Sequence, residues 1–416
     1  MTARIEQPYL LVLFSLLFHV DADGRRWIHP LWAKDLARHA DYIGQLSYAA
    51  PATREPPPPD FVAMDASPAL ASVRCVDLPL SRTRLQAILH LPRLLAILWR
   101  EVGRARIVHT AMAGWPFPEA WLLLQIVRLR GRKLFINVES TFWRVDRGER
   151  AGIGRRLSAG IVERLNRWCV AHSDLSTFTH EGYKRSLTRG GDPRAHVVEA
   201  SWIDEHDILQ VSELPSVLAA RATQGLRAVF AGRLLRAKGI LVLIEAVALC
   251  RDAGLDVVVD CFGDGELEDE CRRRIAELDL GAHLLMRGTL PYDRTFFAAL
   301  RPYHAMIVPS VSDEQPRNVF DAYSQALPVI ASRTAGLQQC VEEGRTGVFF
   351  EAGNALDLKR TLERLAARPE LLAGMAAACL DRAWKSTHAC MHEARRRLII
   401  DAFPGLANAR PAEATS

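Results

Sequence analysis

The sequence predicts an α/β protein made of parallel sheets with helices on both faces. Short apolar runs alternate with longer segments of helical periodicity along most of the 416 residues. Several runs, such as 305–308, are apolar at every position, which is typical of strands covered on both faces. The alternation breaks once, at 205–225. Together these observations favour two doubly wound domains.

The expected elements follow the chain in order. Strands are expected at 10–18, 43–49, 72–78, 106–110, 134–138, 175–179, 196–200, 227–231, 256–262, 283–287, 305–308, 328–331 and 347–350. Helices are expected in most of the gaps, for example at 85–102, 119–130, 240–252, 266–278 and 357–367.

The break at 205–225 divides the chain into domains of ordinary size. We expect a first domain at 1–204, a linker at 205–225 that is polar and contains proline, and a second domain at 226–387. A last helix at 388–403 could cross back to the first domain. The tail at 404–416 has little apolar content and is expected to be disordered.

Composition excludes several classes of protein. Apolar residues make up 49% and charged residues 24% of the chain, which excludes a disordered, collagen-like or coiled-coil protein. The apolar run at 9–18 is too short for a transmembrane helix. A buried first strand explains it better than a signal peptide, because acidic residues follow it without a small-residue cleavage site. Eight cysteines without a C-x-x-C pair argue against disulfides and thiolate zinc, and favour the cytoplasm.

Positive charge is concentrated in the first half of the chain. The net charge is +8 through Asp204 and −3 after it, and 128–168 has 11 basic and 4 acidic residues. Such a field attracts phosphates, an anionic lipid surface or nucleic acid. A general preference for arginine is the alternative, since Arg outnumbers Lys 47 to 6.

Two loops of the second half carry the features of an anion site. The strand at 227–231 leads through Gly232, Arg233 and Lys238 into a helix. Ligands of doubly wound sheets bind beyond the carboxyl ends of strands, where cations and free amides favour a pyrophosphate. The alternative is a surface loop with two solvated cations. A second turn, Gly263-Asp264-Gly265, lacks the third glycine of a dinucleotide motif, and Asp264 could equally be a helix cap.

The segment 309–322 is the most informative. Its strand ends at Val308, and Pro316 fits the first turn of the next helix. Asp313 and Glu314 are therefore expected on the loop and Asp321 inside the helix, set apart along a crevice. A solvated stripe on the helix is the alternative interpretation of Asp321.

In these motifs the second half resembles the nucleotide-sugar domain of the family 4 glycosyltransferases, which have the GT-B fold. The family pattern appears in order over about 120 residues, as Gly232-Arg233, Lys238-Gly239, Gly263-Asp264-Gly265, Pro309-Ser310, Asp313 with Asp321, Ala322, Pro328-Val329 and Thr346-Gly347.

The resemblance implies a retaining, metal-independent transfer of sugar from a nucleoside diphosphate, without a cofactor. Arg233 and Lys238 would hold the diphosphate, and Asp313 or Glu314 the hydroxyls of the sugar. Asp321 would bind the ribose. The remaining implied donor contacts are Gly232, Gly263, Asp264, Gly265, Pro316, Arg317 and Asn318. No metal-ligand cluster is evident in the sequence.

The sequence departs from the family in three places. Both carboxylates at the seven-residue spacing are Asp where the family usually has Glu, and a glycine pair followed by Glu is reduced to the segment 335–339. The first domain matches only faintly. Its glycine loop could be the turn at Gly24, and Glu139 at a strand end could accept the acceptor's proton. His109 and His180, and His19 with them, are further candidates, and for each of these a structural role is the alternative.

The basic stretch at 144–167 contains an amphipathic pattern of Ile153, Leu157, Ile161 and Leu165. In the family the first domain binds the acceptor and often touches the membrane. A lipid-linked phosphate or an anionic bilayer would suit such a helix, and a packed helix with a solvated charged face is the alternative.

We therefore expect a retaining glycosyltransferase of cell-surface polysaccharide, lipopolysaccharide or glycolipid assembly, cytoplasmic or peripheral at the membrane. Its partners would be a nucleotide-sugar and a saccharide or lipid-linked acceptor. The alternatives are an epimerase-like GT-B enzyme and a catalytically silent scaffold that binds nucleotide-sugars. Nucleic acid is not expected as a partner, because no known binding module is present.

Overall fold

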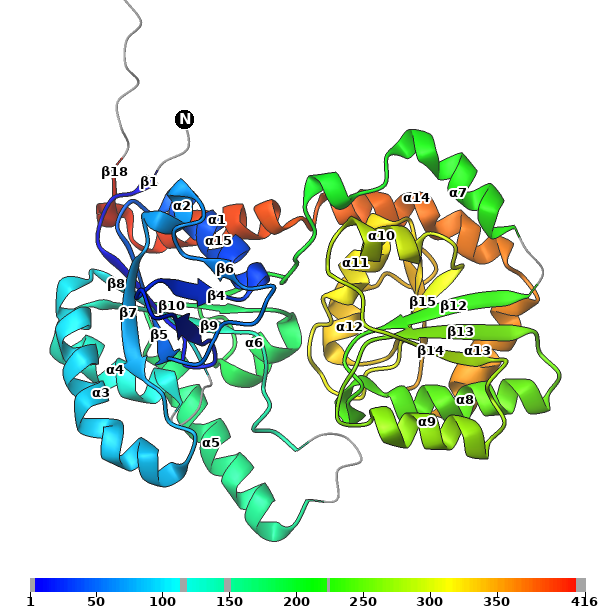
Figure 1. Ribbon diagram of the computed structural model, residues 1–416, viewed down its shortest axis with the longest axis horizontal. Helices are drawn as coiled ribbons and strands as arrows, with labels where there is room; N and C mark the ends of the chain where they lie inside the picture. Colours follow the sequence, from blue (N-terminus) through cyan, green and yellow to red (C-terminus); the bar gives the residue numbers. More distant parts are fainter. Residues whose placement is uncertain (1–3, 113–117, 146–150, 223–224, 409–416) are drawn as a thin grey trace, which may run out of the picture.

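The computed structural model describes residues 4–112, 118–145, 151–222 and 225–408. It shows two lobes, each built on its own sheet (Figure 1). The expected α/β fold class is confirmed. Among the described residues, no helix is long and apolar enough to span a membrane.

The sheet of the second lobe is wholly parallel, with strand order β14-β13-β12-β15-β16-β17. Its strands are β12 (Leu226–Ala231), β13 (Val257–Phe262), β14 (Leu284–Gly288), β15 (Ala305–Val308), β16 (Val329–Ser332) and β17 (Gly347–Phe350). The chain first adds β13 and β14 on one side of β12, and then returns to add β15, β16 and β17 on the other side. The point between β12 and β15 is therefore a switch point, where ligands bind in doubly wound sheets.

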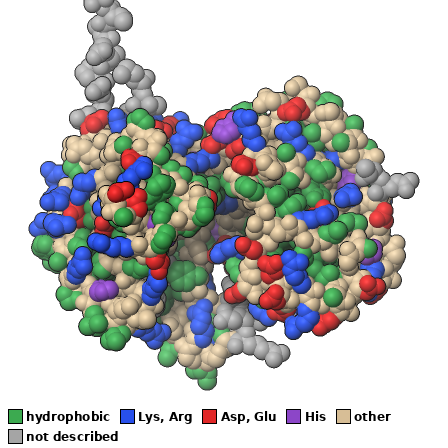
Figure 2. Space-filling model, viewed as in Figure 1, with side chains coloured by type: hydrophobic (Ala, Val, Ile, Leu, Met, Phe, Trp, Pro, Cys, Tyr) green, Lys and Arg blue, Asp and Glu red, His purple; other side chains and the backbone are tan. Residues whose placement is uncertain are grey.

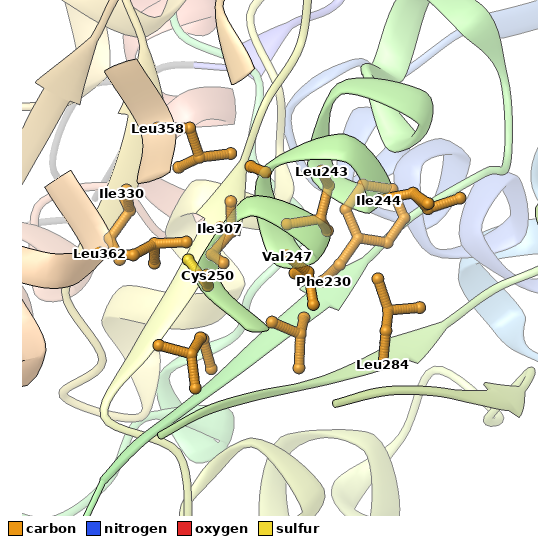
Figure 3. Packing of buried hydrophobic residues seen from close by; sticks show 14 of the residues in the cluster. Phe230, Leu243, Ile244, Val247, Cys250, Leu284, Ile307, Ile330, Leu358 and Leu362 are labelled. Carbon is orange, nitrogen blue, oxygen red and sulfur yellow. The ribbon is translucent and has the colours of Figure 1, made fainter. Parts of the chain in front are cut away.

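Helices cover both faces of this sheet. One face carries α8 (Ile240–Asp252), α9 (Glu268–Glu277) and α13 (Ala355–Ala366), and the other α10 (Arg294–Leu300), α11 (Asn318–Ser324), α12 (Ala335–Cys340) and α14 (Glu370–Trp384). Figure 3 shows the first of these cores, where Leu243 and Val247 of α8 pack on Phe230 and Ile307 of the sheet. All four side chains are buried, which explains why the strands are apolar on both faces.

The first lobe has a ten-stranded sheet. As in the second lobe, the chain adds parallel strands first on one side of its first parallel strand and then on the other. The main parallel strands are β2 (Tyr9–Val12), β5 (Leu46–Thr53), β7 (Arg74–Pro79), β8 (Ile107–Ala111), β9 (Lys133–Val138), β10 (Leu175–Phe178) and β11 (Ala195–Val197). The switch point lies between β2 and β8, which are neighbours in the sheet.

Helices cover this sheet as well. One core includes α3 (Arg84–Arg104), α4 (Glu119–Leu129), α5 (Ile153–Ala171) and α6 (Glu181–Leu187), and the other α1 (Pro30–Tyr42), α2 (Pro68–Ala71) and α15 (His388–Ala402). Because α15 packs against α1, the end of the chain crosses from the second lobe back to the first (Figure 1).

The structure adds to or differs from the expected elements in several places. The run expected as one strand at 10–18 is divided between β2 and β3 (Phe18–Val20), and β3 pairs with β4 (Arg26–Ile28), which pairs with β6 (Val62–Ala63). The expected linker contains α7 (Leu214–Arg221), with Arg221 buried and bonded to the carbonyl oxygens of Gln325 and Ala326. In the tail, β18 (Ala407–Asn408) pairs with β1 (Arg4–Ile5), whereas 409–416 lie outside the described residues.

Candidate active site

A groove runs between the two lobes (Figure 2), and loops at the switch point of each sheet line spaces in it. On the second lobe, the loops after β12 and β15 line a cleft of about 380 Å³ together with Glu139, Ser140, Thr179 and Ala200 of the first lobe. The residues of this cleft therefore come from both sheets. We call it the interlobe cleft.

Glycines let the loops of the second lobe approach one another. Gly239 has φ 74°, and a Cβ there would lie 1.8 Å from the carbonyl oxygen of Pro309 in the loop after β15. Gly263 has φ 136°, and a Cβ there would lie 2.0 Å from the carbonyl oxygen of Gly232. The amide of Leu234 donates a 2.7 Å hydrogen bond to the carbonyl oxygen of Asp264.

The glycine-rich candidates of the second lobe fall into two groups, those that line the cleft and those that support its loops. Gly232 lines the interlobe cleft, whereas Gly263, Asp264 and Gly265 do not line it. The turn at Gly263-Asp264-Gly265 instead packs against the loop that carries Arg233, on the side away from the cleft.

Two cations of this loop face the cleft. Lys238 Nζ lies 3.0 Å from Glu314 Oε2, and the hydroxyl of Ser140 donates a 2.7 Å hydrogen bond to Glu314 Oε1. Burial alone would raise the pKa of Glu314, but Lys238 and the Ser140 hydroxyl outweigh it and lower this pKa. Arg233 also lines the cleft, and no carboxylate of the described part of the chain forms an ion pair with it. Its charge is therefore available to an anionic ligand.

The structure distinguishes the adjacent acids Asp313 and Glu314. Glu314 lines the interlobe cleft, whereas Asp313 Oδ1 accepts a 3.3 Å hydrogen bond from the amide of Ala335 at the start of α12. Asp313 is not among the residues that line the cleft. A contact with a bound sugar is thus open to Glu314 in this geometry.

Asp321 is buried in α11 behind the cleft. The hydroxyl of Tyr292 donates a 2.7 Å hydrogen bond to Asp321 Oδ1. Burial raises the pKa of Asp321 to about 7, and nearby Asp207 adds to the effect. Asp321 does not line the cleft, and its burial excludes the solvated stripe on α11.

The start of α11 contributes the remaining donor-side candidates. Pro316, Arg317 and Asn318 all line the cleft. The side-chain amide of Asn318 donates a 2.7 Å hydrogen bond to the carbonyl oxygen of Ala231, which ties α11 to the end of β12. Arg317 reaches across the groove, where it pairs with Glu139 at 2.5 Å and lies 4.9 Å from the ring of Trp202.

Glu139 stands between the interlobe cleft and a second cavity. Asn137 Nδ2 donates a 3.0 Å hydrogen bond to its Oε1. The second cavity has a volume of about 270 Å³ and lies at the switch point of the first lobe, against Leu13 and Ser15 after β2 and Met112 after β8. Four residues line both spaces: Glu139, Ser140, Ala200 and Arg317. We call this space the first-lobe cavity.

The other candidates of the first domain lie in different places. His109 lines the first-lobe cavity and stacks on Phe135 at 4.0 Å, and burial holds its pKa well below the usual range. His180 is buried at the start of α6, lines neither space, and has its pKa lowered to about 4 by burial. His19 contacts the carbonyl oxygens of Glu55 and Pro56, again outside both spaces.

The structure places the expected glycine loop of the first domain in a hairpin turn. Gly24 has φ 81° and sits in the turn between β3 and β4, where its amide bonds the carbonyl oxygen of Asp21. It lines neither space. The segment that follows the first parallel strand and faces the cavity is the one with Leu13 and Ser15.

Two groups of residues escaped prediction from the sequence. Gln315 holds the lobes together, since its side-chain amide accepts from the amide of Ala200 at 2.8 Å and donates to the carbonyl oxygen of Ala200 at 2.9 Å. The second group is a buried cluster of Asp35, His388 and His392, whose donor atoms meet within hydrogen-bond distance. The four-residue spacing of the two histidines was its only sequence signal, because Asp35 lies far away along the chain.

The apolar stripe of the basic segment is exposed along α5. The exposed fractions are 88% for Ile153, 65% for Leu157 and 53% for Ile161, which excludes a helix packed on this face within the described chain. Arg155 turns inward to the carbonyl oxygens of Trp143 and Arg144. Residues 146–150 of this segment lie outside the described part of the chain.

Comparison with known proteins agrees with this architecture. Residues 220–379 match the family model of the group 1 glycosyl transferases. The lipopolysaccharide core biosynthesis glycosyltransferase LpsE of Rhizobium meliloti is 28% identical over 181 residues, which cover 43% of this chain and 49% of that protein. A D-inositol 3-phosphate glycosyltransferase of Pseudarthrobacter chlorophenolicus is 31% identical over 163 residues, covering 38% of each chain. The chain thus spans about half the length, or less, of these curated relatives.

Solved structures extend the likeness to both lobes. The Anabaena protein HepE in complex with UDP superimposes with a TM-score of 0.67 at 13% identity, covering 95% of this chain and 100% of that one. Sucrose-phosphate synthase from Thermosynechococcus elongatus gives a TM-score of 0.70 at 18% identity, covering 96% and 100%. The chain therefore has the GT-B fold, and its second lobe matches the group 1 glycosyl transferases.

Proposed function

We propose that this protein is a retaining glycosyltransferase that moves a sugar from a nucleoside diphosphate to an acceptor hydroxyl. The observation that carries the proposal is the pair Arg233 and Lys238, which lines the interlobe cleft at the switch point of the second sheet. Arg233 has no carboxylate partner among the described residues, so its donors can receive a diphosphate. The structural relative HepE, solved with UDP and with UDP-glucose, supports this class of donor.

The reaction explains why cations belong at this place. Cleavage of the glycosidic bond leaves negative charge on the departing diphosphate, and groups already in position stabilise that charge as it forms. Arg233 and Lys238 would supply this stabilisation, so that no metal ion is needed at the donor site. Glu314 would bind hydroxyls of the sugar from the same loop that carries Pro316 and Arg317.

The acceptor would lie in the first-lobe cavity. Glu139 stands where this cavity meets the interlobe cleft, so an acceptor hydroxyl there would face the donor sugar. The carboxylate could take the hydroxyl's proton during transfer. Trp32 and Trp202 line the same cavity and offer apolar faces to a saccharide.

We further propose that the protein acts at the cytoplasmic membrane face, in assembly of lipopolysaccharide or another surface glycan. Exposed apolar residues of α5 and of α3, where Leu85, Ile88 and Leu89 are each more than 60% exposed, would enter the interface of an anionic bilayer. Both helices extend toward the lower side of the first lobe in Figure 1. The relative LpsE, a lipopolysaccharide core biosynthesis glycosyltransferase, is consistent with such a product.

A donor screen tests the proposal. The full chain is incubated with UDP-, GDP-, ADP- and TDP-sugars, and the thermal midpoint and the released nucleoside diphosphate are measured. One donor should raise the midpoint by mass action, and it should be consumed only with an acceptor. Conversion of the donor without an acceptor would show an epimerase-like enzyme, and binding without consumption across acceptors would show a scaffold.

A further inference from the structure

Three buried donor atoms of α1 and α15 converge on one point beneath the first-lobe cavity. His392 Nε2 lies 3.0 Å and His388 Nε2 lies 3.3 Å from Asp35 Oδ1, and the two nitrogens are 3.2 Å apart. All three side chains are buried, with exposed fractions of 5% for Asp35, 0% for His388 and 3% for His392.

This triangle has the dimensions of a metal site. Ligand atoms about 2.0–2.1 Å from a tetrahedral zinc ion stand about 3.3 Å from one another. His388 and His392 are four residues apart and lie on one face of α15, as in helical metal sites. We propose that Asp35, His388 and His392 hold a divalent transition-metal ion, and that two imidazoles with one carboxylate favour zinc.

The surrounding groups are those that orient metal ligands. The hydroxyl of Tyr42 lies 3.3 Å from His392 Nδ1, and His39 Nδ1 lies 3.1 Å from Asp35 Oδ2. A network of hydrogen bonds alone fits the geometry less well. Both Nε2 atoms would have to carry protons to reach the same oxygen of Asp35, and this would set the two N–H groups against each other at 3.2 Å.

The ion would fasten the crossing helix to the first lobe. Asp35 belongs to α1 and also lines the first-lobe cavity, so the ion would stabilise the wall of that cavity. Arg395, buried on α15, contacts His39 Nε2 at 3.4 Å and brings a like charge near the ion. Removal of that charge should therefore tighten metal binding. This site is separate from the donor site, where no metal is proposed.

Metal content and cobalt spectroscopy test the inference without an activity assay. The full chain is purified, analysed for bound metals, stripped with a chelator and titrated with Co²⁺. We expect one equivalent of metal per chain. The Co²⁺ complex should show visible d–d absorption without a thiolate charge-transfer band, which separates this site from the cysteines.

Variants assign the site. His392→Gln and Asp35→Asn should each weaken Co²⁺ binding at least tenfold, and Arg395→Met should strengthen it. His206→Gln is the matched control, because His206 is an exposed histidine outside this cluster, and the variant should bind metal like the wild type. A folded wild-type chain that neither retains metal nor develops the cobalt spectrum would overturn the inference. So would metal retained in full by folded Asp35→Asn, and the wild-type spectrum decides the matter if the variants fail to fold.

Discussion

Ser140 of the first lobe donates a 2.7 Å hydrogen bond to Glu314 of the second, and Glu314 also pairs with Lys238 at 3.0 Å. A single carboxylate therefore connects the first lobe to a cation of the proposed donor site. Because Glu314 contacts both lobes, we expect the position of Lys238 to depend on how the two lobes sit against each other.

Glu314→Gln should lower turnover more than Asp313→Asn. The first change removes a charged partner of Lys238 within the interlobe cleft, and a hydrogen bond to a charged group is worth roughly 1.5–3 kcal/mol. We expect a loss of roughly ten- to a hundredfold. Asp313 caps α12 outside the cleft, so its variant is the matched control, with kcat and KM measured for both. Equal losses in the two variants would reject the assignment of Glu314.

Gln315→Ala should destabilise the closed arrangement of the lobes. It leaves the amide and the carbonyl of Ala200 without their side-chain partner, and an unsatisfied buried group costs about 1–3 kcal/mol. The free energy of unfolding in urea should fall by about that amount, and X-ray scattering should show a larger radius of gyration. Gln125→Ala, on the exposed face of α4, should change neither quantity.

Stability should depend on pH through Asp321. The pKa of this carboxyl is about 7 in the folded chain, above its ordinary value of 3.8, so folding favours the protonated form. The resulting stabilisation is complete below about pH 4 and is lost as the pH rises through about 7. Between these limits the slope is at most about 1.4 kcal/mol per pH unit.

Asp321→Asn should remove this contribution, because an amide does not titrate. The unfolding free energy of the wild type should therefore fall relative to that of the variant as the pH rises from 5 to about 7, and the difference should then stay constant up to pH 8. Parallel curves would mean that Asp321 is ionised throughout.

Ile153→Ser with Leu157→Ser should weaken binding to anionic vesicles. Each side chain is more than 60% exposed on α5, and burial of such a side chain in an apolar phase gains about 1.5–3 kcal/mol. Sedimentation with phosphatidylglycerol vesicles should show at least a tenfold loss. Leu356→Ser, on the exposed surface of the second lobe, is the control and should bind like the wild type. Unchanged binding of the double variant would remove α5 from the membrane surface.

The second lobe was predictable from its sequence because its signals are local. A fully apolar strand such as β15 needs only its own residues to be recognised, and the loops that follow β12 and β15 carry Arg233 and Glu314 within a few residues of a strand end. The first-lobe cavity was not predictable, because its lining includes residues such as Asp35 and Arg395, which meet only after the chain crosses back. The hairpin of β3 and β4 was not predicted either, and it places Gly24, which we had expected in a glycine loop, in the turn between two strands.

The central claim is that Arg233 and Lys238 bind the diphosphate of the donor. It is tested most directly by calorimetric titration of Arg233→Ala with the preferred nucleoside diphosphate and with its nucleoside. Arg236→Ala is the control, because Arg236 lies in the same loop but pairs with Glu270 at 3.2 Å. We predict that Arg233→Ala weakens diphosphate binding at least tenfold and leaves nucleoside binding unchanged. Arg236→Ala should leave both affinities unchanged. Diphosphate affinity equal to the wild type in Arg233→Ala would contradict the account.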